Sequence, residues 1–255
     1  MKITLLSLAV LLMAAGAPRG AGAAEIKVLT AGAFKQVVVA LVPDFEKQTG
    51  HKVTVDNETV GGLLKRIDGG EAFDVLFISP GALNDLAKKG KIVDGSGVPL
   101  ARVGVGVMVK AGAPKPDVST VDAFKKALLD AKSVAYIDPA SGGSSGIYVA
   151  GLLDKLGIAD QVKAKAKLKK GGYVADLIKS GEAELGIHQI SEIVPVKEVT
   201  LVGPLPAEIQ NYTTYAGGLS SAAKDPEAAK ALLKVFTGPA ATELLKSKGM
   251  EPPKS

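Results

Sequence analysis

The chain has 255 residues, with 31 Lys and Arg against 26 Asp and Glu, and it contains neither Cys nor Trp. This length is enough for one domain or two lobes with an ample hydrophobic core. The absence of Cys excludes disulfides, thiolate catalysis and Cys-based zinc sites. The basic residues form no block interleaved with aromatic residues, and we therefore expect no nucleic-acid partner.

A signal peptide is predicted over residues 1–24. Lys2 provides a positive start, an apolar run follows over 3–15, and the small residues Ala21-Gly22-Ala23-Ala24 offer cleavage after Ala23 or Ala24. The apolar run is too short to span a bilayer comfortably. We expect an exported, periplasmic protein that is soluble and not membrane-anchored, with a mildly basic charge that suits a small anionic ligand.

The first part of the mature chain predicts alternating strands and helices. The predicted elements are a strand over 26–30, a helix over 34–49, a strand over 53–55, a helix around 63–67, a strand over 75–78 and a short helix around 83–89. Apolar residues at helical spacing indicate the helices, and short β-branched runs indicate the strands. The strand over 75–78 is almost continuously apolar, which is typical of a strand covered on both faces.

The second part continues the alternation and then returns to the first. Its predicted elements are a strand over 103–109 that bends at its glycines between two lobes, helices over 120–131, 147–156 and 173–180, strands over 133–137, 183–188, 199–202 and 210–216, and helices over 226–236 and 239–248. The Lys-rich run over 163–170 is interpreted as solvated surface. This order predicts an α/β fold with mainly parallel sheets, whose ligands bind at the carboxyl ends of the strands.

One loop between a predicted strand and a predicted helix is rich in glycine and serine. It reads Asp138-Pro139-Ala140-Ser141-Gly142-Gly143-Ser144-Ser145-Gly146-Ile147-Tyr148. Free backbone N–H groups at a helix start, together with the helix dipole, favour negative charge. The loop therefore predicts a site for a small anion. A flexible turn with a serine N-cap is the alternative interpretation of the same composition.

Motifs spread over the mature sequence match one known family. They are Asp138-Pro139 with Gly146-Ile147-Tyr148, the stretches 74–79 and 152–157, Leu185-Gly186-Ile187, and Gly238-Pro239-Ala240-Ala241. With them the chain resembles the periplasmic solute-binding proteins of ABC importers, and most closely their molybdate-binding branch. The resemblance implies a type II fold of two lobes that close around a ligand, with lobe 1 over 25–103 and 213–255 and lobe 2 over 104–212. We expect a monomer with an ABC permease as partner, and neither cofactor nor metal.

The residues that hold the oxyanion in the molybdate binders are changed here. Ala33 stands at the position of the first serine, Val60 and Gly61 replace a serine pair, and Gln189 stands at the position of a tyrosine. Each lost charge-assisted bond costs about 1.5–3 kcal/mol, so we expect an organic (poly)carboxylate rather than molybdate or tungstate. The expected ligand-binding residues are Gly32, Ala33, Phe34, Gly61, Gly62, Arg66, Ser79, Ser141, Gly142, Gly143, Ser144, Ser145, Gly146, His188 and Gln189.

Two functions remain open for such a chain. The first is a periplasmic receptor that delivers the anion to an ABC importer. The second is an exported aconitate isomerase, since the resemblance extends to that enzyme, which interconverts trans- and cis-aconitate by moving an allylic proton. For the enzyme, the expected catalytic residues are His188, Glu192, Arg66 and Ser144, with Tyr148 and Tyr215 as further candidate proton carriers.

Structural roles are the alternative for three of the charged or titratable candidates. Arg66 also fits a solvated position on a helix, and Lys35 also fits the protein surface. His188 follows a predicted buried strand, where a core histidine with satisfied nitrogens is as plausible as a ligand contact.

Overall fold

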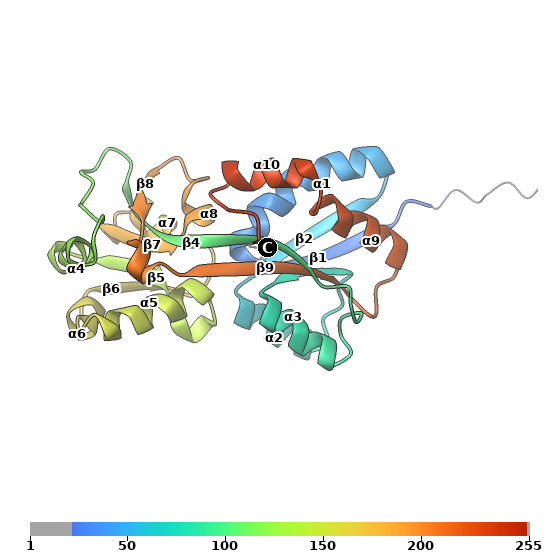
Figure 1. Ribbon diagram of the computed structural model, residues 1–255, viewed down its shortest axis with the longest axis horizontal. Helices are drawn as coiled ribbons and strands as arrows, with labels where there is room; N and C mark the ends of the chain where they lie inside the picture. The colour runs from blue at the N-terminus through green and yellow to red at the C-terminus, as the bar shows by residue number, and fades with distance from the viewer. Residues whose placement is uncertain (1–21, 254–255) are drawn as a thin grey trace, which may run out of the picture.

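The computed structural model describes residues 22–253, so the predicted signal peptide lies outside the described residues except for its last three positions. Two lobes lie end to end along the longest axis and are joined by two long strands (Figure 1). None of the helices in the described part of the chain is long and apolar enough to cross a membrane.

Lobe 1 is a sheet with helices on both faces, built from the two ends of the chain. Its strands are β1 (Glu25–Ala31), β2 (Lys52–Glu58), β3 (Val75–Ile78) and β9 (Tyr212–Leu219). Its helices are η1 (Gly32–Phe34), α1 (Lys35–Thr49), α2 (Val60–Asp68), α3 (Pro80–Lys88), α9 (Pro226–Val235) and α10 (Pro239–Ser247). Strand β1 pairs in parallel with β2 and β3, while β9 runs antiparallel to β3. All four residues of β3 are buried, as a strand covered on both faces requires.

Lobe 2 is built from one continuous segment. Its strands are β5 (Val134–Ile137), β6 (Ala166–Lys169), β7 (Leu185–Gln189) and β8 (Val199–Pro204). Its helices are α4 (Val121–Asp130), η2 (Pro139–Ser141), α5 (Ser144–Lys155), α6 (Ala159–Lys163), α7 (Ala175–Lys179), α8 (Ile190–Ile193) and η3 (Ala207–Ile209). Strand β5 pairs in parallel with β6 and β7.

One strand belongs to both lobes. Strand β4 (Val98–Lys110) pairs with β9 up to Gly104 and with β7 from Val105 onward. The sheet order is therefore continuous, β2-β1-β3-β9-β4-β7-β5-β6, with β8 also pairing with β4. Val103 packs in the core of lobe 1 and Val105 in that of lobe 2. The cores thus separate within this strand, near the glycines at which the sequence predicts a bend.

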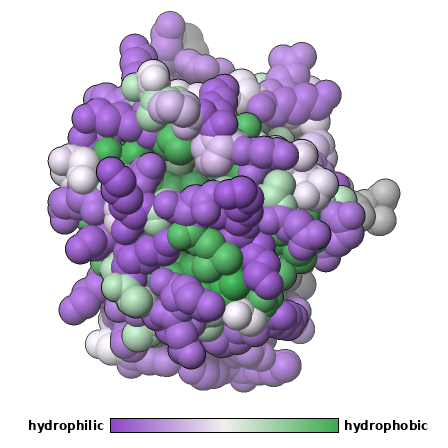
Figure 2. Space-filling model, turned by 90° about the vertical axis from the view of Figure 1, so that its left-hand side faces the viewer, coloured by the Kyte–Doolittle hydropathy of each residue, from purple (hydrophilic) through white to green (hydrophobic). Residues whose placement is uncertain are grey.

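The α/β fold with two lobes is as the sequence predicts, but several short elements were not predicted, and one of them is a strand. The Lys-rich run over 163–170 contains the edge strand β6, which pairs with β5 through Ala166–Lys169. Lysine is common on edge strands because its charge hinders pairing with another chain. Because of these lysines, the hydrophobic pattern of the sequence does not indicate a strand here. Hydrophilic side chains cover most of the lobe 2 end of the molecule (Figure 2).

The Asp74 side chain fastens the two ends of the chain to each other in lobe 1. It is 5% exposed, and its carboxylate accepts hydrogen bonds from the backbone N–H of Lys27 at 2.7 Å and of Lys224 at 2.9 Å. Both donors would be left without a partner by Asp74→Ala. We expect this substitution to lower the free energy of unfolding by about 3 kcal/mol in urea titrations.

Asp85→Ala is the matched control for that titration. Asp85 is exposed and pairs only with Lys88, one turn along the same helix. Its removal should change the free energy of unfolding by less than about 0.5 kcal/mol. Equal midpoints for Asp74→Ala and Asp85→Ala would show that Asp74 does not hold the two ends together.

Candidate functional site

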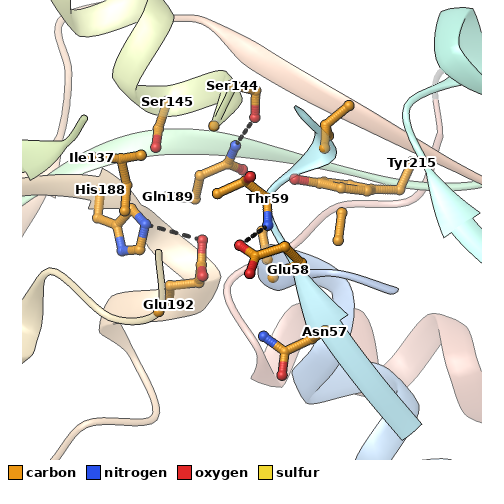
Figure 3. A pocket seen from close by; sticks show the side chains of 16 residues that line it. Asn57, Glu58, Thr59, Ile137, Ser144, Ser145, His188, Gln189, Glu192 and Tyr215 are labelled. Carbon is orange, nitrogen blue, oxygen red and sulfur yellow. Dashed lines mark hydrogen bonds and ion pairs between the residues drawn. The ribbon is translucent and has the colours of Figure 1, made fainter. Parts of the chain in front are cut away.

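A cavity of about 40 Å³ lies between the lobes (Figure 3). Lobe 1 contributes Ala31, Gly32, Ala33, Asn57, Glu58, Thr59, Val60 and Tyr215. Lobe 2 contributes Ile137, Gly143, Ser144, Ser145, Gly172, His188, Gln189 and Glu192. The cavity thus lies where each lobe presents the carboxyl ends of its parallel strands.

Three strand-to-helix turns bring helix N-termini to this cavity. Strand β1 leads through η1 into α1, β2 leads into α2, and β5 leads through η2 into α5. Backbone N–H groups at such starts have no partner within the helix and attract negative charge. No Lys or Arg is among the lining residues within the described chain. Donors for an anion therefore come from the backbone and from uncharged side chains, such as the hydroxyls and the Asn57 amide.

The two lobes meet beside the cavity at Gly61 and Gly142. The backbone N–H of Gly61 donates to the Gly142 carbonyl at 3.2 Å, and the Thr59 hydroxyl donates to the Ser141 carbonyl at 2.6 Å. A Cβ added to Gly61 would lie 2.9 Å from the Gly142 Cα, and Gly142 has a φ of 74°. Glycine is therefore required at both positions for this approach. The structure has its cleft closed.

A buried histidine–glutamate pair lines the lobe 2 side of the cavity. His188 Nε2 lies 3.2 Å from Glu192 Oε2, and the two side chains are 2% and 9% exposed. Burial disfavours the charged form of both groups. Burial lowers the pKa of His188 to about 3. It raises the pKa of Glu192 to about 8, and the nearby Lys35 ammonium partly offsets this rise. At neutral pH the pair therefore holds one exchangeable proton between two uncharged groups.

The local fold brings the Glu192 carboxyl against lobe 1. Helix α8 follows β7 directly, and the Ser191 hydroxyl donates to the Ala33 carbonyl at 2.8 Å. A Cβ on Gly32 would lie 2.8 Å from Glu192 Oε1. The small turn after β1 therefore makes room for an acid from the opposite lobe.

A second polar cluster surrounds Gln189. Its Nε2 donates to Ser144 Oγ at 2.9 Å and to Thr213 Oγ1 at 3.0 Å. The Tyr215 ring is buried and stacks on Phe34. Burial raises the pKa of Tyr215 well above its usual range, although the neighbouring Ser144 and Gln189 side chains partly offset this. The tyrosine is therefore a neutral donor at physiological pH.

About half of the expected site residues line the cavity. Those that do are Gly32, Ala33, Gly143, Ser144, Ser145, His188, Gln189 and the candidate acid–base residue Glu192. Ser141, Gly142 and Gly61 instead form the contact between the lobes. Phe34 packs in the lobe 1 core against Phe77, and the remaining predicted residues lie away from the cavity or beneath its wall.

Those remaining residues have structural environments of their own. Gly146 packs against the backbone of β5, because a Cβ there would lie 2.2 Å from the Ile137 carbonyl oxygen. Gly62 lies beneath the Glu58 side chain, and Ser79 precedes α3. The Tyr148 hydroxyl donates to the Ile209 carbonyl, away from the cavity.

Arg66 requires a correction of its expected role as a carboxylate clamp. It does not line the cavity, and its guanidinium pairs with Asp56 and Glu71 on the surface of lobe 1. These hydrogen bonds raise the pKa of Arg66 and lower that of Glu71 to about 2. Its charge is thus already neutralised by two carboxylates of its own lobe, which agrees with the alternative of a structural arginine on a helix.

Three lining residues on the β2–α2 turn were not expected, namely Asn57, Glu58 and Thr59. Thr59 caps α2 by accepting from the Gly62 N–H at 3.0 Å, and Glu58 Oε1 accepts from the Thr59 N–H at 2.7 Å. A threonine just before a helix is a recognisable N-cap signal that marks this turn. The expected ligand-binding residues on this turn are based on the serine positions of the oxyanion site and not on this threonine signal.

Metal binding has no support among residues 22–253, where no three His, Cys, Asp or Glu side chains gather as a possible ion site. His51 lies at the start of β2, where its Nδ1 accepts a hydrogen bond from the Ala24 N–H.

Comparison with known proteins agrees with this architecture. The family model described as bacterial extracellular solute-binding protein matches residues 26–251. An aconitate isomerase of Pseudomonas sp is 33% identical over 89% of this chain and 87% of its own length. The molybdate-binding protein ModA of Azotobacter vinelandii is 31% identical, with 90% of each chain covered.

A solved structure has the same fold. The periplasmic molybdate-binding protein of Azotobacter vinelandii superposes with a TM-score of 0.77 at 23% identity, over 90% of this chain and 100% of that one. Since the family model spans nearly the whole described chain, this protein belongs to the bacterial extracellular solute-binding proteins.

Proposed function

We propose that this protein is a periplasmic isomerase that closes its two lobes around a small unsaturated polycarboxylate and moves an allylic proton, converting trans- into cis-aconitate and back. The observation that carries this proposal is the buried His188–Glu192 pair. Simple capture of an anion has no use for an uncharged acid and an uncharged base facing each other in a cleft. Perturbed titratable pairs of this kind are typical of proton-transfer sites.

The chemistry needs one base and no cofactor. Glu192, in its carboxylate form, removes a proton from the methylene carbon of the substrate. The electron pair moves through the allylic system, and the proton returns to the former vinyl carbon. The double bond has then shifted by one position, and the new alkene has either geometry. His188 Nε2, 3.2 Å from Glu192 Oε2, orients the carboxylate and stabilises its charge.

Binding of the substrate carboxylates is assigned to the helix starts of α1, α2 and α5 together with the Ser144 and Ser145 hydroxyls. These donors carry no net charge, so they hold an anion without fixing the protonation state of Glu192. Closure of the cleft excludes water and strengthens each of these bonds. The name of the Pseudomonas relative, aconitate isomerase, supports the proposed activity.

A receptor that delivers an organic anion to an ABC permease is the second candidate. Membership of the solute-binding family favours it. The contact between Gly61 and Gly142 also supports it, because lobe closure alone is enough for a receptor. Under this alternative the His188–Glu192 pair only helps to hold the closed form.

Conversion of trans-aconitate separates the two functions. We expect the mature protein to produce the vinyl proton signal of cis-aconitate in NMR spectra, and Glu192→Gln to lower the rate by at least about 100-fold because it removes the base. Glu198→Gln, an exposed position on the same segment, is the matched control and should keep the parent rate. Binding without conversion by the parent protein would favour the receptor.

The rate should also depend on pH through Glu192. Because burial raises its pKa to about 8, the carboxylate form becomes more abundant as the pH rises. We expect kcat/KM to increase about tenfold per pH unit below this value and to level off above it. A profile that levels off near the ordinary pKa of a carboxyl group would rule out Glu192 as the base.

Stability should show the same titration with the opposite sign. Glu192 ionises at about 4.5 in the unfolded chain but only at about 8 in the folded one. Between these values the folded state holds the extra proton, so raising the pH lowers stability by up to about 1.4 kcal/mol per unit. Glu192→Gln lacks this loss, and its stability advantage in urea titrations should grow over this range. A pH-independent difference would argue against a neutral Glu192.

A further inference from the structure

The side-chain amide of Gln189 has its nitrogen next to two hydroxyl groups. Its Nε2 uses both hydrogens, one toward Ser144 Oγ and one toward Thr213 Oγ1. The Thr213 hydroxyl then donates to Ser144 Oγ at 3.4 Å. Ser144 Oγ therefore accepts two hydrogen bonds, which occupy both of its lone pairs. Its own O–H can then donate to the neighbouring Tyr215 oxygen or to a group in the cavity.

The opposite end of the Gln189 amide has no partner. Gln189 is 2% exposed and lines the cavity, and its Oε1 is a buried acceptor without a hydrogen bond. Turning the amide over would bury two N–H donors without partners in place of one acceptor, which is the costlier arrangement. A buried polar atom of this kind requires an explanation, and a ligand supplies one.

Gln189 thus differs in kind from the anion-binding groups around it. Backbone N–H groups and the Ser144 hydroxyl donate hydrogen bonds, whereas Gln189 Oε1 only accepts them. A fully ionised oxyanion such as sulfate or molybdate brings no hydrogen, so its negative oxygen would face an acceptor oxygen. A group of the form –OH satisfies both sides, because its oxygen accepts from Ser144 and its hydrogen goes to Gln189.

We propose that Gln189 and Ser144 form a specificity subsite for a ligand group that both donates and accepts a hydrogen bond, either a hydroxyl or a carboxyl that keeps its proton. This inference rests on the proposed function for the identity of the acid. It also adds to that function, since a carbon next to a protonated carboxyl loses its proton far more readily than one next to a carboxylate. Gln189 is then a specificity-determining residue, and Thr213 is a positioning residue that acts through Ser144.

Calorimetry of the mature protein at pH 7 tests the subsite with four probes. We expect binding of trans-aconitate and citrate, and none of sulfate or molybdate. Titrations in two buffers of different ionisation enthalpy then identify the source of the hydrogen. Uptake of about one proton indicates a protonated carboxyl, and binding of citrate without proton uptake indicates its hydroxyl. Uptake that persists in Glu192→Gln, in Glu58→Gln and in His188→Gln belongs to the ligand rather than to the lining carboxyl and imidazole groups.

Two variants separate the acceptor from the scaffold around it. Gln189→Met keeps the length of the side chain but removes the acceptor, and should weaken the binding of trans-aconitate and citrate by about 10- to 100-fold. Thr213→Val removes one hydroxyl of the cluster but leaves the acceptor, and should weaken the binding of the organic acids less than Gln189→Met does. Thr213→Ser should restore the parent affinity. Circular dichroism checks that each variant is folded.

Several results would overturn the subsite. They are sulfate or molybdate binding as tightly as the acids, unchanged affinity in Gln189→Met, or no binding of any probe that carries a donor. Failure of the proposed isomerase would look different, because trans-aconitate would then bind with these signatures and remain unconverted.

Discussion

Desolvation of two facing titratable groups is the constraint on which the site depends. His188 and Glu192 lie on consecutive elements, β7 and α8, and both lose nearly all contact with water. Burial of an ion pair would be expensive, so the pair stays uncharged and shares a proton instead. The anion donors of the wall are neutral, and no lining residue of the described chain is a lysine or arginine.

The fold was largely predictable from sequence because its signals are local. Short β-branched runs and amphipathic helices identify most elements, and the glycines of β4 indicate a bend between the lobes. The strand β6 was not predicted because it is only four residues long, two of them lysines, and lies in a Lys-rich run that is typical of solvated surface. Helix α8, only four residues long, is also below the length at which periodicity is informative.

Site residues that directly follow a predicted strand could be predicted from the sequence. Those whose role depends on how the two lobes come together could not. His188, Gln189 and the Ser144 loop could be placed because each lies at the carboxyl end of a predicted strand. The surface pairing of Arg66 depends on Glu71, beyond the end of its helix, and on Asp56 in the preceding strand, and sequence alone cannot weigh such partners. The cavity role of Glu58 and Thr59 likewise depends on how the second lobe closes over them.

The strand order has a consequence for how the protein forms as it is made. Strand β9 lies between β3 and β4 in the sheet, yet it is the last strand in the sequence. The lobe 1 sheet therefore has a gap between β3 and β4 until residues 212–219 are made, whereas the lobe 2 core is complete within residues 105–209. We expect lobe 2 to fold first, and the lobe 1 sheet to be completed only when β9 is added. Until β9 is in place, that unfilled gap is the part of the sheet to which a chaperone or another strand has most time to bind.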